Sequence, residues 1–174
     1  MVSFRKADMA DIDMIAEIYD ELHEAEENGK ASIGWIRGIY PTRETAEDSV
    51  KAGDMFVAED DGCIVAAGRI NQCQCPEYKD AEWKYEVPDD EVMVFHTLVV
   101  SPAVKGRGYG TEFVAFYERY ALEHGCRCLR MDTNEKNKAA RSLYRRLGYD
   151  EVSIVPTTFN GIPDVNLVCL EKRI

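Results

Sequence analysis

The stretch VMVFHTLVVSPAVKGRGYGT, residues 92–111, runs from a strongly apolar segment into a glycine-rich loop. The apolar run Val92–Val100 is typical of a strand in the middle of a sheet. The three glycines allow the backbone to turn sharply and to approach a ligand closely, and a helix is expected to begin within the loop. Because the first turn of a helix has free N–H groups and a partial positive charge, the stretch predicts an anion site that suits a phosphate.

Two common phosphate-binding motifs do not fit this loop. The dinucleotide fingerprint G-x-G-x-x-G would need a glycine where Phe113 stands, and a P-loop would need Gly-Lys-Ser/Thr where Gly110 is followed by Thr111. A glycine-rich turn that binds nothing is the alternative interpretation.

A second motif, NKAARSLYRRLGY at residues 137–149, lies on the last predicted helix. Asn137, Ala140 or Arg141, and Tyr144 recur with helical spacing and therefore share one face of it. This face presents an amide and a phenol on the same side. A tyrosine that packs on the core is the alternative.

The pattern along the chain predicts an α/β (α+β) fold in a single domain, residues 1–174. We expect a mixed, mostly antiparallel sheet of about seven strands with helices on both faces, because strand–helix–strand units favour parallel pairing and hairpins favour antiparallel pairing. The predicted order is β-α-α-β-β-β-α-β-α-β-β. Strands are expected at residues 2–6, 55–59, 64–71, 92–100, 128–132, 149–155 and 165–171, helices at 11–26, 42–52, 108–124 and 136–147, and a loop at 157–163.

Charge and hydropathy exclude several classes of protein. The formal charge of −11 over 174 residues disfavours general nucleic-acid binding. Residues 101–148, in contrast, are rich in Lys and Arg. This basic segment is either a site for a small polyanion or a set of solvated helix faces. No apolar run approaches the ~20 residues of a membrane-spanning helix. The N-terminus lacks the apolar segment of a secretory signal, so we expect a cytoplasmic protein with reduced thiols.

The six cysteines include two C-x-C pairs, whereas zinc sites more often use C-x₂₋₄-C. We therefore expect no metal. Cys126 and Cys128 are predicted to pack on one face of a strand. The six are Cys63, Cys73, Cys75, Cys126, Cys128 and Cys169.

The two motifs in this order resemble the GNAT superfamily of acyl-CoA-dependent N-acetyltransferases. An apolar strand, the loop Lys-Gly-Arg-Gly-Tyr-Gly, a helix, a strand and then Asn-x-x-Ala-x-x-x-Tyr-x-x-x-Gly-Tyr carry the resemblance. In element order it covers nearly the whole chain, and in motif detail it covers residues 92–152. It implies acetyl-CoA as co-substrate and direct attack by an amine in a ternary complex.

The resemblance also implies roles for individual residues. The loop residues Lys105, Gly106, Arg107, Gly108, Tyr109, Gly110 and Thr111 would hold the CoA diphosphate through their backbone N–H groups. Lys105 stands where the family has Gln or Arg and keeps a donor there. The preceding strand would carry a bulge and diverge from its neighbour, so that the backbone of Leu98, Val99 and Val100 pairs with the pantetheine arm. An N–H near Leu98 would face the thioester oxygen.

On the last helix, Asn137 and Ala140 would lie beside the pantetheine, and Tyr144 would lie near the sulfur as the catalytic acid. The interior of the strand at residues 92–100 has no carboxylate that could act as the base. His96 is the candidate, since it shares strand parity with Leu98 and has a suitable pKa. A structural histidine and a relay of ordered water are the alternatives.

The acceptor pocket is expected between the first two helices and the loop at residues 157–163. Trp35 and Tyr40 are candidate substrate-binding residues, although Trp35 fits a plain core position equally well. The acidic stretch at residues 77–91 could attract a cationic acceptor, or it could be a solvated loop.

The leading prediction is an enzyme that acetylates a primary amine of a small molecule. A protein or peptide N-acetyltransferase, a non-catalytic acyl-CoA-binding regulatory module and a zinc-binding module built from the C-x-C pairs are the alternatives. Neither nucleic acid nor membrane is an expected partner. A homodimer is compatible with the sequence, and nothing in the sequence requires one.

Overall fold

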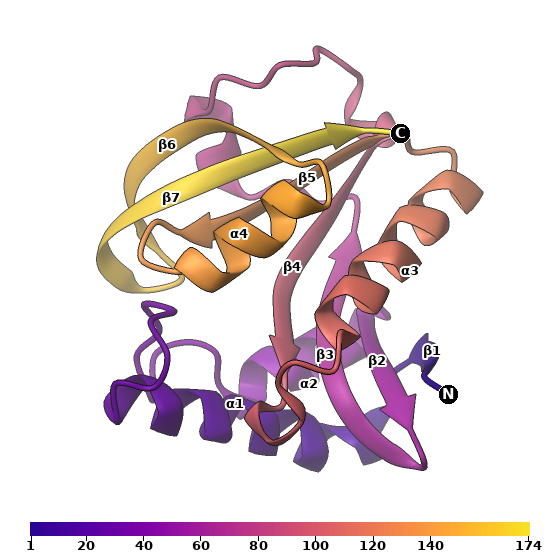
Figure 1. Cartoon of the computed structure of the whole chain (residues 1–174). Helices are drawn as coiled ribbons and strands as arrows, with labels where there is room; N and C mark the ends of the chain where they lie inside the picture. Colours follow the sequence, from indigo (N-terminus) through magenta and orange to yellow (C-terminus); the bar gives the residue numbers. More distant parts are fainter.

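A seven-stranded mixed sheet runs through the molecule in the order β1-β2-β3-β4-β5-β7-β6 (Figure 1). The computed structural model describes residues 1–174. Only β4 and β5 pair in parallel, so the predicted mixed, mostly antiparallel sheet is confirmed. The strands are β1 (Ser3–Lys6), β2 (Met55–Asp60), β3 (Cys63–Asn71), β4 (Val92–Val100), β5 (Cys128–Asn134), β6 (Asp150–Phe159) and β7 (Ile162–Arg173), and the helices are α1 (Ile12–Glu27), α2 (Arg43–Lys51), α3 (Tyr109–Glu123) and α4 (Lys138–Arg146).

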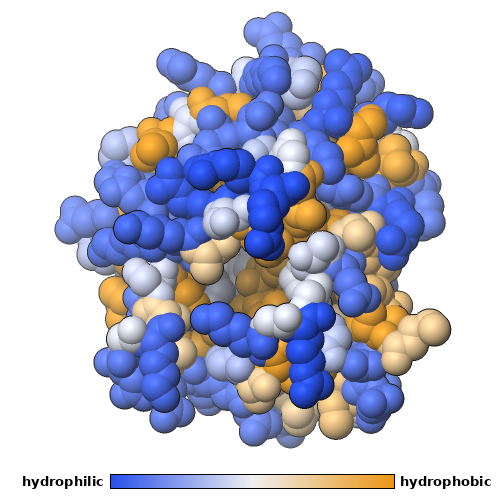
Figure 2. All heavy atoms as spheres, in the orientation of Figure 1, coloured by the Kyte–Doolittle hydropathy of each residue, from blue (hydrophilic) through white to orange (hydrophobic).

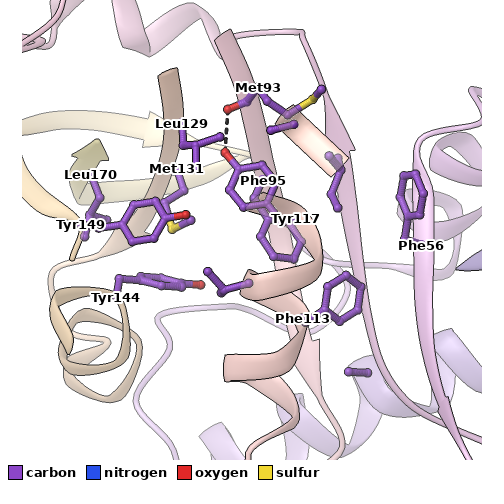
Figure 3. Packing of buried hydrophobic residues seen from close by; sticks show 14 of the residues in the cluster. Phe56, Met93, Phe95, Phe113, Tyr117, Leu129, Met131, Tyr144, Tyr149 and Leu170 are labelled. Carbon is purple, nitrogen blue, oxygen red and sulfur yellow. Dashed lines mark hydrogen bonds between the residues drawn. The ribbon is translucent and has the colours of Figure 1, made fainter. Parts of the chain in front are cut away.

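Helices α3 and α4 cover one face of the sheet (Figures 1 and 3). Phe113 and Tyr117 of α3 are fully buried against Phe95 of β4. The Tyr117 hydroxyl donates a hydrogen bond of 2.6 Å to the carbonyl oxygen of Met93. This hydrogen bond satisfies the one polar atom of an otherwise apolar ring and holds α3 in register with β4.

The opposite face is covered in two parts. Helix α1 packs Ile15 and Tyr19 against the sheet at Val57 and Val99. The segment at residues 72–91, which contains the short 3₁₀ helix η2 (Pro76–Asp80), covers β4, β5 and β7 instead. Helices on both faces were predicted, and the polar segment at residues 72–91 proves to be a cover for the sheet.

A buried ion pair fixes this cover. Arg130 Nε lies 2.9 Å from Glu171 Oε2, and both side chains are almost inaccessible to solvent. The other carboxylate oxygen of Glu171 accepts hydrogen bonds from the backbone N–H groups of Lys84 and Tyr85. The Arg130 guanidinium also lies 4.3 Å from the centre of the Trp83 ring. The paired charges therefore attach an irregular segment to two strands of the sheet.

The sheet opens between its two parallel strands. The β4–β5 ladder ends at the pair Phe95–Met131, while β5 continues beside β7 as far as Asn134. Just beyond the ladder, the β3–β4 register shifts, and Thr97 takes a positive φ of 52°. This extra residue is a β-bulge, which bends a strand and locally disrupts its pairing.

The bulge also changes which residues share a face. Leu98 packs with the cluster beneath α3, whereas His96 points to the cover at residues 72–91, where it meets Cys75. The predicted shared parity of His96 and Leu98 is therefore wrong, because Thr97 interrupts the alternation of the strand.

The last hairpin is longer than the sequence pattern predicts. Strands β6 and β7 extend through most of the expected loop at residues 157–163, and only Asn160 and Gly161 turn. Their φ values of 51° and 79° are those of a type I′ turn, for which Asn-Gly is the preferred pair. The Asn-Gly pair was the signal that could have placed the turn.

Smaller differences have local causes. Helix α4 begins at Lys138 because Asn137 is its N-cap, and Oδ1 of Asn137 accepts a hydrogen bond from Ala140 N. Cys126 and Cys128 are both buried as predicted, but they lie in different clusters on opposite faces because Cys126 precedes β5. No helix combines the length and the apolar character that crossing a membrane requires.

Candidate active site

A cavity of about 520 Å³ lies where β4 and β5 diverge. Its lining comes from α1 and the loop after it, α2, β2, β3, the start of the cover at residues 73–76, β4, β5, α4 and the β6–β7 hairpin. The face seen in Figure 2 is hollowed near its centre, with apolar residues inside and hydrophilic residues around the rim. The bulge and the separation of the strands therefore produce a ligand-sized space in the middle of the sheet.

One wall of the cavity is the strand β4 itself. Leu98, Val99 and Val100 all line the cavity, together with His96 and Thr97. Along these residues the edge of β4 that faces β5 has no strand partner. An extended molecule can add to such an edge through backbone hydrogen bonds.

The glycine-rich loop lies at the end of this strand. Gly106 and Gly108 both have φ of 87°, a conformation that residues with a Cβ rarely adopt, and Gly108 is the N-cap of α3. A Cβ atom on Gly110 would lie 3.3 Å from Leu143 Cδ2 and 3.8 Å from Val100 Cγ2. The start of α3 is therefore packed closely against both α4 and the end of β4.

The loop presents several backbone N–H groups without an acceptor in the chain. Lys105 N and Arg107 N donate within the loop, to the carbonyl oxygens of Pro102 and Val104 at 3.3 and 3.4 Å. The donors without an intramolecular acceptor belong to Gly106, Gly108, Tyr109, Gly110 and Thr111. Donors grouped at a helix N-terminus can bind an anion such as a diphosphate.

The charged and aromatic side chains of the loop have separate positions. Lys105 and Arg107 are exposed and form no salt bridge. The hydroxyl of Tyr109 donates a hydrogen bond of 2.6 Å to Asp60 at the end of β2. Lys105 and Arg107 can therefore supplement the anion site with positive charge, whereas Tyr109 can contribute only its backbone N–H.

The N-cap and two residues of α4 also line the cavity. They are Asn137, Ala140 and Tyr144, the three that share a helix face in the sequence. The Tyr144 ring is buried and extends from α4 toward β4 and α3 (Figure 3). Its hydroxyl makes no hydrogen bond within the chain, and burial, followed by the negative charge of Asp132, raises the pKa of the Tyr144 phenol. Tyr144 is therefore a proton donor and not a phenolate at neutral pH.

His96 lies in a polar chain of side chains. Asn71 Nδ2 donates to Asp54, so its Oδ1 is the atom that lies 2.9 Å from His96 Nε2. Nε2 must then carry the proton, and the lone pair is on Nδ1, 3.7 Å from the sulfur of Cys75. Burial, followed by the charge of Arg69, lowers the pKa of His96 to about 4. The imidazole is therefore neutral at pH 7.

Trp35 and Tyr40 both line the cavity and meet edge to face, with ring centres 6.1 Å apart. The Tyr40 hydroxyl is hydrogen-bonded to the hydroxyl of Thr97, the bulge residue. Burial raises the pKa of Tyr40 to about 12. Phe159, Asn160 and Ile162 of the β6–β7 turn complete this side of the cavity.

Asp132 of β5 lines the cavity and was not singled out by sequence reasoning. Its Oδ2 accepts a hydrogen bond of 2.6 Å from the hydroxyl of Tyr78. Burial raises the pKa of Asp132 to about 6, although the Tyr78 hydrogen bond opposes the shift. Its position in the sequence could have indicated it. Asp132 follows Arg130 by two residues, so both side chains lie on the same face of β5, and charged residues are unusual on a covered face of a sheet.

None of the His, Cys, Asp and Glu side chains form a group of three or more that could hold a metal ion. Cys75 lies beside His96, and burial raises the pKa of its thiol, so it is neither a thiolate ligand nor a nucleophile at neutral pH. Among the groups of the cavity that could transfer a proton are therefore the phenol of Tyr144, the imidazole of His96 and the carboxylate of Asp132.

Comparisons with known proteins agree with this geometry. The sequence model of the acetyltransferase (GNAT) family matches residues 13–149. An uncharacterized N-acetyltransferase of Methanocaldococcus jannaschii is 33% identical over 76 residues, which are 44% of this chain and 34% of that protein. The chain is thus matched to about a third of the length of that relative.

Solved structures share the fold. A GNAT-family acetyltransferase from Streptococcus agalactiae superposes with a TM-score of 0.83 at 23% identity, covering 99% of this chain and 95% of that one. A Salmonella typhimurium acetyltransferase solved with its cofactor acetyl-CoA has a TM-score of 0.69 at 17% identity, covering 99% and 93%. With the family match spanning most of its length, the chain belongs to the GNAT family of acetyltransferases.

Proposed function

We propose that this protein transfers the acetyl group of acetyl-CoA to a primary amine of a small molecule in a ternary complex. One observation carries the proposal. The unpartnered edge of β4 runs along the cavity from His96 to Val100, between the free N–H groups at the start of α3 and the phenol of Tyr144. This arrangement suits a long molecule with a diphosphate at one end and a reactive thioester at the other.

Three parts of the chain would contact acetyl-CoA. The N–H groups of the loop from Gly106 to Thr111 would bind the diphosphate, and Lys105 and Arg107 would add charge. The backbone of Leu98, Val99 and Val100 would pair with the amides of the pantetheine arm. Asn137 and Ala140 would lie along its other side. The Salmonella typhimurium relative in the same fold was solved with acetyl-CoA, which supports this assignment.

The reaction joins the amine nitrogen to the acetyl carbon and breaks the bond from that carbon to sulfur. A backbone N–H near Leu98 would stabilise the negative charge that develops on the thioester oxygen. Tyr144 would give its proton to the departing sulfur. His96 remains the base that the sequence predicts, and any such role would use Nδ1, because Nε2 donates to Asn71.

The shape of the cavity favours a small acceptor over a protein. Trp35, Tyr40 and the β6–β7 turn line its acceptor side, and the cavity of about 520 Å³, which would also hold the end of the pantetheine arm, leaves room for a small acceptor. Two carboxylates, Asp48 and Asp132, line it, which suits a cationic amine. A peptide acceptor would need an open groove at this side.

Two measurements test the proposal. Calorimetry with CoA should show binding, and a library of primary amines with acetyl-CoA should release thiol at a rate that depends on the amine. Binding of CoA without thiol release from any amine would favour a non-catalytic acyl-CoA-binding module. Absence of CoA binding would overturn the proposal altogether.

A further inference from the structure

We infer that Asp132 binds the ammonium group of the acceptor and takes its proton, so that the acceptor is a primary alkylamine that enters the cavity as a cation. The inference rests on the proposed function of the site. It assigns the base to Asp132 of β5 and not to His96, which lies in β4 on the other side of the opening.

The position of Asp132 follows from the way the sheet opens. Met131 makes the last pair with β4, so Asp132 is the first residue of β5 whose β4 neighbour has moved away. It still pairs with Cys169 of β7, and its backbone is therefore held in regular sheet. Its side chain lies beneath η2, on the same face as Cys128 and Arg130. A rigid strand thus presents a carboxylate to the space created by the bulge.

The carboxylate has no cationic partner in the chain. Oδ2 accepts the hydrogen bond from Tyr78, Oδ1 accepts none, and Asp132 is in no salt bridge. The contrast is Glu171 on the neighbouring strand, whose buried carboxylate is matched by Arg130 and two backbone N–H groups. Because a carboxylate withdrawn from water is costly without a charged partner, Asp132 is suited to receive one from a ligand.

The groups around Asp132 supply no positive charge. Several titratable groups lie close enough for their pKa and that of Asp132 to be linked, and all of them are acidic groups. They are Glu77, Tyr78 and Cys75 of the cover, Cys169 of β7, Tyr144 of α4 and Tyr40 of the loop after α1. The cation that lines the same cavity, Arg69, is bound to Asp54 at 3.2 Å. An acceptor ammonium would therefore be the missing counter-charge.

Asp132 is also close enough to both functional sides of the cavity for its charge to act on each. Its negative charge raises the pKa of Tyr144, on the side of the predicted sulfur, and that of Tyr40, on the acceptor side. A nitrogen atom in contact with the Asp132 carboxylate would then lie near both the acceptor wall and the thioester. This is the position that attack on the acetyl carbon requires.

The proton transfers balance as follows. The Asp132 carboxylate accepts one proton from the ammonium, which gives a neutral amine with a free electron pair. The nitrogen forms its bond to the acetyl carbon, and the bond from carbon to sulfur breaks with its electrons on sulfur. Tyr144 protonates the sulfur and recovers a proton from the new amide nitrogen. Asp132 finally releases its proton to solvent, and the products are the amide and CoA thiol.

The environment of Asp132 supports this role. With its pKa raised to about 6, the carboxylate is ionised at pH 7 and is also a stronger base than an ordinary aspartate. His96, with its pKa lowered to about 4 and Nε2 bound to Asn71, is the weaker base of the two.

The test uses the whole protein with acetyl-CoA and three primary amines, 2-phenylethylamine, cadaverine and glucosamine, alongside the amine library. For the fastest amine, kcat/KM of the wild type is measured as a function of pH. It should decrease as the pH is lowered through about 6, and this decrease is the acid limb of the profile. Asp132→Asn should lower kcat by about 100-fold and abolish this acid limb, while CoA binding by calorimetry stays unchanged. Asparagine keeps the shape and the acceptor for Tyr78.

Three further variants make the test specific. His96→Gln keeps a donor for Asn71 and should retain the acid limb. Tyr78→Phe removes the hydrogen bond that lowers the Asp132 pKa and should move the limb to higher pH. Glu77→Gln removes a negative charge and should move it to lower pH with turnover retained.

The outcomes separate the two proposals. If the wild type turns over an amine and Asp132→Asn keeps both the rate and the acid limb, the inference about Asp132 is wrong and the proposed function stands. Loss of the limb in His96→Gln would assign the base to His96 instead. If the wild type acetylates no amine, the proposed function fails, and the role of Asp132 fails with it.

Discussion

The Tyr78 hydroxyl and the Asp132 carboxylate are joined by a hydrogen bond of 2.6 Å. Tyr78 belongs to η2, in the irregular cover, and Asp132 belongs to β5, at the point where the sheet opens. The bond thus links the segment that shields the cavity to the carboxylate inside it. It stabilises the ionised form of Asp132, whereas burial disfavours that form more strongly, and the net effect is a pKa of about 6.

We expect Asp132→Asn to increase stability at neutral pH. A carboxyl whose folded-state pKa is raised to about 6 from an ordinary value near 3.8 binds protons more tightly when folded, so its contribution to stability falls as pH rises from about 4 to 6. Removing the charge should therefore add up to about 3 kcal/mol to the free energy of unfolding at pH 7 and almost nothing at pH 4. Urea unfolding of both proteins across this range measures the difference.

The comparison between variant and wild type isolates Asp132 from His96. The lowered pKa of His96 has the opposite effect on the free energy of unfolding. The contribution of His96 is lost as the pH falls from 6.5, the ordinary pKa of a histidine, to about 4, its pKa in the folded protein. Both proteins contain His96, so this contribution cancels in the difference. A variant that is less stable than the wild type at pH 7 would show that Asp132 holds the structure together and is not a site residue.

Tyr144→Phe should lower turnover by about 100-fold and leave the affinity for acetyl-CoA nearly unchanged. The change removes only the hydroxyl, which makes no hydrogen bond in the chain, while the buried ring keeps its packing. The matched control is Tyr149→Phe, whose hydroxyl bonds Glu118 outside the cavity. Steady-state rates with calorimetry check both. Equal turnover in Tyr144→Phe and wild type would remove Tyr144 from the mechanism.

The order of the elements could be predicted because local signals are strong. The apolar run of β4 and the glycines before α3 each determine structure over a few residues. Helical spacing alone also predicts that Asn137 and Tyr144 share a face, and the structure places that face on the cavity. These features need no knowledge of distant contacts.

The remaining features depend on contacts between distant residues. Asp132 becomes a candidate only when Tyr78, 54 residues earlier, covers it and β4 has moved away. The interrupted parity at His96 results from one bulge residue, Thr97, whose positive φ no local pattern indicates. The polar segment at residues 72–91 becomes a cover because Arg130 and Glu171 bind it from two other strands.

Gly108→Ala should weaken CoA binding by more than tenfold and cost about 1–2 kcal/mol of stability. The residue has φ of 87°, and a strained or shifted backbone there would misdirect the N–H groups of Gly108 and Tyr109. Gly62→Ala is the matched control, because Gly62 has φ of 77° and open space around it in the β2–β3 turn. It should lose similar stability and bind CoA normally. Equal CoA affinity in the two variants would argue against the loop as the diphosphate site.

Glu171→Gln should destabilise the fold by about 3–5 kcal/mol, the usual cost of leaving one charge of a buried ion pair alone. Arg130 would keep its charge, with 7% of its side chain exposed, and the N–H groups of Lys84 and Tyr85 would lose a charged acceptor. Asp150→Asn, which breaks the exposed pair with Lys84, should cost at most about 1 kcal/mol. Chemical unfolding measures both. Because the Arg130–Glu171 pair anchors the cover that contains Tyr78, the rate of hydrogen exchange in residues 72–91 should also rise in Glu171→Gln. It should stay at the wild-type level in Asp150→Asn. Equal protection of this segment in both variants would show that the cover is held by other contacts.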